Sequence, residues 1–168
     1  MFYKLKYSFL TLVILITMSG CSLNPMYGEN SGSSLIIENI YINQVRDRDH
    51  QIIRSELLKL VGTNNSEANN KLELDFKVDI SRTPLLIETS GEGNRMQIDV
   101  KVSYGVFRIT DFRELILNDT VRVINTYTLS DSEYNNAQAD ISTYKLISKE
   151  IATNIHRQIS LNYLKLVE

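Results

Sequence analysis

Cysteine and histidine are scarce in this 168-residue sequence, and tryptophan is absent. The single cysteine, Cys21, excludes an intrachain disulfide, because that bond needs two thiols. The two histidines, His50 and His156, fall in expected helices and have no second histidine, cysteine or suitably spaced carboxylate beside them. The sequence therefore predicts no metal site, and both histidines are expected to be surface or helix-face residues.

The motifs of common catalytic and nucleotide-binding sites are also missing. No G-x-S-x-G nucleophile elbow is present. The glycines at Gly91 and Gly93 lack the spacing and the strand-to-helix setting of a phosphate-binding loop, and they are typical of a hairpin tip. Carboxylate pairs such as Asp47 and Asp49 fit helix capping better than acid–base catalysis. We therefore expect no catalytic residues and no enzymatic activity.

Long apolar runs are missing as well. The longest, from Phe9 to Ile16, is far shorter than the roughly 20 residues that a membrane-spanning helix needs. It follows two lysines, Lys4 and Lys6, and it ends before the small residues of Ser19-Gly20. This layout is typical of a secretory signal peptide, which we expect over residues 1–20.

Cys21 directly follows the small residues. The tetrapeptide Met18-Ser19-Gly20-Cys21 resembles the lipobox of bacterial lipoproteins, which usually has leucine where this chain has Met18. The resemblance implies that the Cys21 thiol is acylated and that Cys21 begins the mature chain; the alternative is an incidental free thiol. Ser22, in place of aspartate, then implies the outer membrane, with the protein lipid-anchored on the periplasmic side. We expect no cofactor other than this covalent lipid.

The mature chain would have the size of one domain. Removal of the two lysines leaves 16 of the 18 basic residues against 20 acidic ones, a formal net charge of −4. This balance gives no general case for nucleic-acid binding. Residues 22–34 are rich in Gly, Ser, Asn and Pro, so we expect a lipidated N-terminus and tether over 21–34. A single folded domain is expected over 35–168.

Hydrophobic periodicity predicts four strands and two helices in that domain. The strands are predicted at 35–42, 71–80, 96–106 and 115–127, and the helices at 47–62 and from 132 onward. Ser130 and Glu133 match a capping box for the second helix, which would be roughly 30 residues and about 45 Å long. A phase slip at Val106-Phe107 predicts a β-bulge. In the last strand Leu115, Leu117, Val121 and Val123 are in phase, and they are expected to share the core face.

The predicted element order is β-α-β-β-β-α. The last three strands are joined by short links, which favours antiparallel pairing, whereas the helix between the first two allows parallel neighbours. We therefore predict an α+β fold, a two-layer sandwich in which two helices cover one face of a four-stranded, mostly antiparallel sheet. The other face of the sheet is expected to be polar.

Basic residues stand near the predicted strand ends and on the polar face. Arginine pairs with phosphate oxygens through its planar fork, so these positions are candidate contacts for phosphate groups. The alternative is a solvated face of mixed charge that keeps the domain soluble. The candidates are Arg82, Arg95, Lys101, Arg108 and Arg113.

Two stretches of the chain carry a family resemblance. The second stretch, residues 107–164, contains a strand–turn–strand unit, a Ser/Asp-rich cap followed by Tyr134, and a long final helix. The first stretch consists of a cysteine, an apolar residue, proline, a second apolar residue, tyrosine and glycine: Cys21, Leu23, Pro25, Met26, Tyr27 and Gly28. Both stretches resemble the lipopolysaccharide-assembly lipoproteins of the LptE family, which often have a basic residue where this chain has Asn24.

The resemblance implies a non-enzymatic plug inside LptD, a large outer-membrane β-barrel of the Gram-negative envelope. Such a protein helps the barrel assemble and assists lipopolysaccharide transport into the outer leaflet. The implied partners are the LptD-type barrel, lipopolysaccharide and the outer membrane, and the five basic residues become candidate lipopolysaccharide contacts, although no family motif places them. The alternative is an outer-membrane lipoprotein that serves another envelope assembly machine as a protein-binding accessory or chaperone and does not bind lipopolysaccharide.

Overall fold

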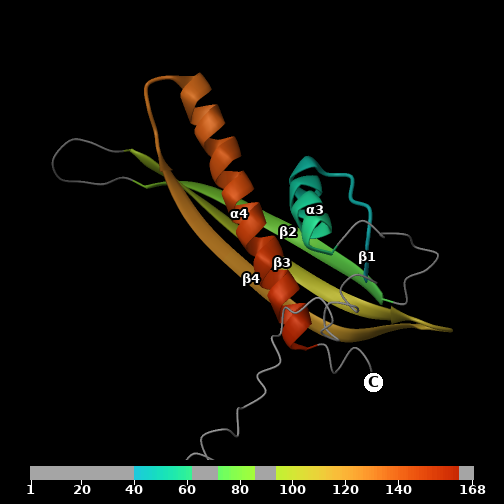
Figure 1. Ribbon diagram of the computed structural model, residues 1–168. Coiled ribbons are helices and arrows are strands. Elements are labelled where there is room, and N and C mark those ends of the chain that lie inside the picture. The colour runs from blue at the N-terminus through green and yellow to red at the C-terminus, as the bar shows by residue number, and fades with distance from the viewer. Residues whose placement is uncertain (1–39, 62–71, 86–93, 163–168) are drawn as a thin grey trace, which may run out of the picture.

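The computed structural model describes residues 40–61, 72–85 and 94–162 (Figure 1). Its four strands form one sheet in the order β1-β2-β3-β4. The first pair is parallel and the other two pairs are antiparallel, which confirms the predicted mostly antiparallel α+β fold. The elements are β1 (Ile40–Ile42), α3 (Arg48–Val61), β2 (Leu72–Leu85), β3 (Arg95–Ile109), β4 (Arg113–Thr128) and α4 (Glu133–Leu161).

Both helices lie on one face of the sheet, with α4 running along it and the shorter α3 beside it (Figure 1). The core forms between the two layers because the strands alternate apolar and polar residues, so that one set of side chains meets the apolar faces of the helices. The most deeply buried side chains include Leu74 on β2, Ile98, Val100, Val102 and Val106 on β3, and Ile147, Ile151 and Ile155 on α4.

Strand β2 continues five residues beyond its predicted end at Ile80, to Leu85, and includes Pro84. β1 pairs only with Leu72 to Leu74, so the rest of that edge of β2 has no neighbouring strand among the described residues. The amide of Val78 points to this edge, where it meets a histidine side chain. Pro84 lies an even number of residues further along, so its missing N–H falls on the unpaired edge and costs no ladder hydrogen bond.

The predicted capping box of α4 is wrong. The N-cap is Ser132, whose hydroxyl accepts a hydrogen bond from the amide of Asn135. Glu133 is the first residue of the helix, whereas a capping box needs the glutamate three residues after the N-cap, where its side chain can accept a hydrogen bond from the N-cap amide. Ser130 instead bonds to the side chain of Asn136. The 29-residue length of α4 agrees with the prediction. Residues 163–168 of the predicted final helix and residues 35–39 of the predicted first strand lie outside the described ranges.

The predicted β-bulge is present between β3 and β4. Val106 pairs with Leu117 and Phe107 with Leu115, so Ile116 is the extra residue. The bulge reverses the side-chain alternation at the start of β4, and Leu115 consequently leaves the core face that its phase with Leu117 predicted. Half of its surface is exposed on the opposite face.

Candidate functional site

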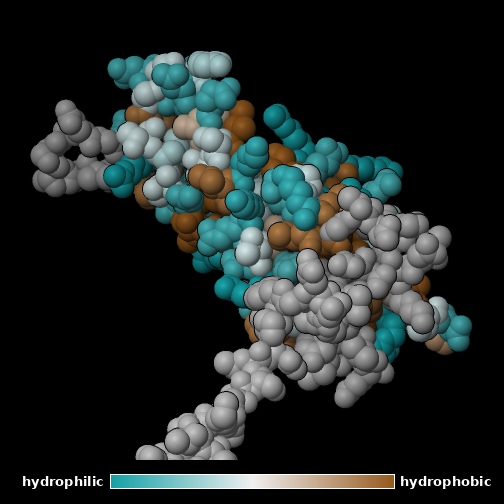
Figure 2. Space-filling model, in the orientation of Figure 1, coloured by the Kyte–Doolittle hydropathy of each residue, from teal (hydrophilic) through white to brown (hydrophobic). Residues whose placement is uncertain are grey.

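The sheet face opposite the helices, here called the uncovered face, is polar, as the alternation predicts. The register brings its side chains into rows across β2, β3 and β4. These rows are Asp75–Gly105–Asn118, Lys77–Ser103–Thr120 and Asp79–Lys101–Arg122. On the other side of the molecule, polar side chains alternate with apolar ones over the exposed sides of the two helices (Figure 2). The uncovered face therefore carries both acidic and basic side chains.

Arg113, at the start of β4, is held by a cluster on the uncovered face. Its Nη2 donates to Glu73 Oε1 at 3.0 Å and also to Asp75 Oδ2. The guanidinium lies over the Phe107 ring, with its carbon 3.8 Å from the ring centroid. Asn43, just after β1, donates its amide to the same two carboxylates. The hydrogen bond to Asp75 is the main cause that raises the pKa of Arg113.

Gly105 lies beneath this cluster, where a larger residue would crowd its neighbours. A Cβ atom there would lie 3.0 Å from Leu115 Cδ1 and 3.1 Å from Phe107 Cε2. Both side chains lean over the glycine and cover the backbone that it leaves bare, in the manner of an aromatic residue that rescues a strand glycine. The bulge makes this possible, because it turns Leu115 toward the same face as Phe107.

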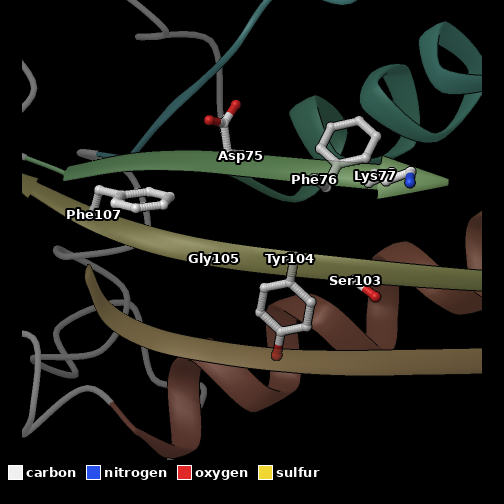
Figure 3. A pocket seen from close by; sticks show the side chains of 7 residues that line it. All are labelled: Asp75, Phe76, Lys77, Ser103, Tyr104, Gly105 and Phe107. Atoms are coloured by element: carbon white, nitrogen blue, oxygen red, sulfur yellow. The ribbon is translucent and has the colours of Figure 1, made fainter.

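A shallow cavity of about 430 Å³ opens beside Gly105. It is lined by Asp75, Phe76 and Lys77 of β2 and by Ser103, Tyr104, Gly105 and Phe107 of β3 (Figure 3). The carboxylate of Asp75, the ammonium group of Lys77 and the hydroxyl of Ser103, together with aromatic residues, give it mixed polarity. This combination of groups forms hydrogen bonds with polar ligands but has no net charge that favours an anion.

Two of the five candidate cations, Arg95 and Lys101, carry charges that meet no carboxylate of the described residues within 4.0 Å. Both are exposed on β3. Lys101 lies between Asp79 and Arg122 in its row. Arg122 bonds to Asp99, and this hydrogen bond is the main cause that lowers the pKa of the Asp99 carboxyl.

Arg82 belongs to the opposite face of the sheet. Its Nε donates to Asp140 Oδ1 of α4 at 2.9 Å, and its Nη2 donates to the second oxygen at 3.1 Å. The Tyr127 hydroxyl donates to the same carboxylate at 3.4 Å. This bidentate pair ties the end of β2 to the first third of α4, so Arg82 has a structural role in addition to its candidate role.

Arg108 lies at the other end of the sheet, with its Nη1 4.0 Å from Glu114 Oε2. It lies thirteen positions after Arg95 along β3, which is about 40 Å at the rise of a strand. The five candidate cations therefore do not form one patch. Arg95 lies at one end, Lys101 in the middle, and Arg108 and Arg113 at the far end, while Arg82 faces the helices. The role of all five as lipopolysaccharide contacts stays a prediction.

The cluster around Arg113 escaped sequence reasoning. Its carboxylates, Glu73 and Asp75, lie about 40 residues before the arginine, and Asn43 lies a further 30 before them. The available signal was the alternation of β2, which places both carboxylates on the polar face. Which side chains of the other strands these carboxylates meet depends on the register between strands, and a single sequence does not specify that register.

The two histidines take structural positions. His50 Nδ1 contacts Asp47 Oδ2 at 2.9 Å, and its Nε2 accepts a hydrogen bond from the Val78 amide at 3.2 Å. The ring also stacks against Phe76 with centroids 6.1 Å apart. His156 on α4 is partly buried, and burial lowers its pKa.

Within residues 40–61, 72–85 and 94–162, neither helix is long and apolar enough to cross a membrane. The same ranges contain no group of three or more His, Cys, Asp or Glu side chains placed to hold a metal ion. Cys21, the predicted lipidation site, lies outside them, as do the predicted signal peptide and tether.

The fold is shared with solved lipoprotein structures at low sequence identity. A lipoprotein candidate from Caulobacter crescentus CB15 superposes with a TM-score of 0.68 at 16% identity, covering 82% of this chain and 98% of that one. The rare lipoprotein B from Shewanella oneidensis gives a TM-score of 0.55 at 14% identity, over 77% of this chain and 98% of that one. A minor lipoprotein from Acinetobacter baumannii gives 0.53 at 16% identity, over 74% and 90%.

The sequence matches no protein-family model, and no curated protein matches it. At identities of 14–16% the structural likeness establishes the architecture alone. The chain thus has the two-layer α+β fold that is found in these three lipoproteins.

Proposed function

We propose that this protein is an outer-membrane lipoprotein that occupies the lumen of an LptD-type β-barrel. In this role it helps the barrel assemble and assists the insertion of lipopolysaccharide into the outer leaflet. The lipid on Cys21 would hold it at the periplasmic side of the membrane, because the several acyl chains of a lipoprotein cysteine anchor firmly where one chain binds only marginally. The lipobox and the LptE-like stretches of the sequence support the proposal, and so does the fold shared with three lipoproteins.

The observation that carries the proposal is the uncovered face. A two-layer domain normally keeps one sheet face in water, and here the rows from Asp75 to Asp79 are polar across β2, β3 and β4, while apolar Phe107 and Leu115 lie at the β3–β4 end of that face. The lumen of a large outer-membrane barrel is also polar, so these polar rows can face it without desolvating an apolar surface. Its ion pairs, such as that of Arg122 with Asp99, are already formed and need no partner from the barrel wall.

The first experiment is a mild-detergent purification of the tagged, lipidated protein from its own envelope. We expect a large, heat-modifiable barrel to copurify in a one-to-one ratio. The matched control is the Cys21→Ala variant, which has no thiol to acylate. We expect this variant to be absent from the membrane fraction. Recovery of the wild-type protein alone, or with a soluble partner, would favour the alternative of an accessory protein for another assembly machine.

Lipopolysaccharide contact is a separate part of the proposal. Arg95 and Lys101 are the best of the five candidates, since neither forms an ion pair within 4.0 Å with a carboxylate of the described residues. The double variant Arg95→Glu/Lys101→Glu should weaken binding to purified lipopolysaccharide at least ~10-fold, because two attractive charges become repulsive. The control is Lys145→Glu, which reverses an exposed charge on α4. Equal loss in both variants, or no loss in the double variant, would contradict these two contacts.

A further inference from the structure

The turn between β3 and β4 exposes an unusual amount of apolar surface. Residues 109–115, here called the β3–β4 tip, include Ile109 with 40%, Phe112 with 83% and Leu115 with 50% of the residue surface exposed. The amide of Thr110 donates to the Phe112 carbonyl at 3.4 Å and closes the turn. The turn backbone is therefore held while the Phe112 ring projects from it.

The base of the tip is rigid. Arg113 is fixed by the Phe107 ring and by the carboxylates of Glu73 and Asp75. The strands of the tip also belong to the longest paired ladder of the sheet, β3 with β4. A rigid apolar projection loses little conformational entropy when it enters another phase, and this favours insertion over a role as a mobile loop.

The chain arrives at this same end of the sheet from its predicted anchor. Ile40, the first residue of β1, is level with Leu72, which pairs with Arg108, which in turn pairs with Glu114 (Figure 1). Cys21 precedes Ile40 by 19 residues, a stretch that spans at most about 65 Å. Because β3 itself is about 50 Å long, an anchor at Cys21 keeps the domain near the membrane but does not decide which end faces it.

The tip carries no excess of positive charge. Its charged residues are Asp111, Arg113 and Glu114, and Arg108, directly before it, brings the formal sum to zero. A site for anionic phosphate would carry an excess of positive charge, whereas a tip without one and with a projecting aromatic ring suits the boundary between head groups and acyl chains. The tip is also convex, so it fits a deformable lipid surface better than a protein groove that it would have to match in shape.

We propose that the β3–β4 tip inserts into the interface of the membrane that holds the Cys21 lipid and so orients the free lipoprotein before it meets a barrel. The inference rests on the proposed function in one respect, the acylation of Cys21. The lipid sets the distance of the domain from the membrane, and Phe112, with Ile109 and Leu115 beside it, sets which end of the sheet faces the bilayer.

The absence of tryptophan makes the test direct. The lipidated full chain carrying Phe112→Trp is reconstituted in phosphatidylcholine vesicles in which part of the lipid has brominated acyl chains. The matched control carries Tyr134→Trp, since Tyr134 is 72% exposed at the start of α4, near the opposite end of the sheet. We expect the bromines to quench the fluorescence of the Phe112→Trp variant at least ~3-fold more strongly than that of the control, because interfacial insertion reaches only about 5–10 Å.

Flotation of the vesicles separates the possible failures. A protein that floats with equal quenching in the two variants is anchored but not oriented, which overturns this inference and leaves the proposed function intact. A protein that does not float has no lipid anchor, which contradicts both. Quenching of the Phe112→Trp variant that disappears in about 0.5 M salt, where the screening length is only a few ångströms, would show an electrostatic contact and would also overturn the proposal.

Discussion

The guanidinium carbon of Arg113 lies 3.8 Å from the centre of the Phe107 ring, so a cation at the start of β4 covers an aromatic ring of β3 on the uncovered face. Phe107 and Leu115 in turn cover Gly105. This stack joins two strands through side chains at the point where the bulge interrupts their regular ladder. Two predictions follow from this stack, one for substitution of Arg113 and one for substitution of Gly105.

The variant Arg113→Gln should lower the free energy of unfolding by about 1 kcal/mol, because it removes the ring contact and leaves Glu73 and Asp75 with Asn43 as their remaining partner among the described residues. Arg113 is nearly half exposed, which keeps the effect small. Urea denaturation at low and at high salt measures it. The conservative control is Arg113→Lys, which retains the charge, and a loss that is the same for Gln at both salt concentrations would contradict the electrostatic part.

The variant Gly105→Ala should destabilise the protein by roughly 1–3 kcal/mol, since the new methyl group overpacks against the side chains of Leu115 and Phe107. Leu115→Ala removes the nearer of the two contacts, at 3.0 Å. The double variant should therefore be more stable than the sum of the single effects predicts, by at least ~0.5 kcal/mol. Strict additivity in thermal denaturation would show that the crowding lies elsewhere.

The variant His50→Phe should cost about 1–3 kcal/mol. A phenyl ring preserves stacking on Phe76, but it cannot accept the hydrogen bond that Val78 donates from the unpaired edge of β2. His50→Gln is the control, because its side-chain oxygen can accept the same bond. Amide hydrogen exchange at Val78 provides the local measurement, and unchanged protection in the phenylalanine variant would contradict the role assigned to the ring nitrogen.

The Tyr104 hydroxyl is buried and has no hydrogen-bond partner among the described residues. Burial is the main cause that raises the pKa of Tyr104 to about 12. Removing an unsatisfied hydroxyl releases its desolvation cost, so Tyr104→Phe should be neutral or stabilising by up to about 1 kcal/mol. Chemical denaturation measures this. A clear loss of stability would instead show that an ordered water satisfies the hydroxyl.

Stability should fall with decreasing pH partly through His156. Burial lowers the pKa of His156 in the folded protein below its ordinary value of 6.5. As the pH drops through 6.5 the unfolded chain therefore binds a proton that the folded chain does not, and the free energy of unfolding decreases until the folded-state pKa is passed. His156→Gln should flatten the part of the curve of stability against pH that begins as the pH falls through about 6.5, and stability measured by denaturation over a pH series checks this.

Local periodicity was sufficient to predict the architecture. The alternation of β2 and β3 is independent of any partner, because successive side chains of a strand point to opposite faces wherever the strand lies. The bulge was predicted from the apolar pair Val106-Phe107 of β3, but the extra residue is Ile116 of the opposite strand, and Phe107 keeps the regular alternation of β3 on the uncovered face. The end of β2 was missed because the pattern weakens at the unpaired edge, where Pro84 carries no penalty.

The candidate site depended on contacts that no local pattern contains. By itself the sequence determined the alternation, the polar face, the scarcity of chemistry-bearing residues and the positions of five basic side chains. Tertiary structure alone decided that Arg82 pairs with Asp140, that Arg113 is held by Glu73 and Asp75, and that Arg95 and Lys101 meet no described carboxylate. The physical reason is that periodicity fixes the face on which a side chain lies, whereas register and helix placement bring distant residues within hydrogen-bonding distance.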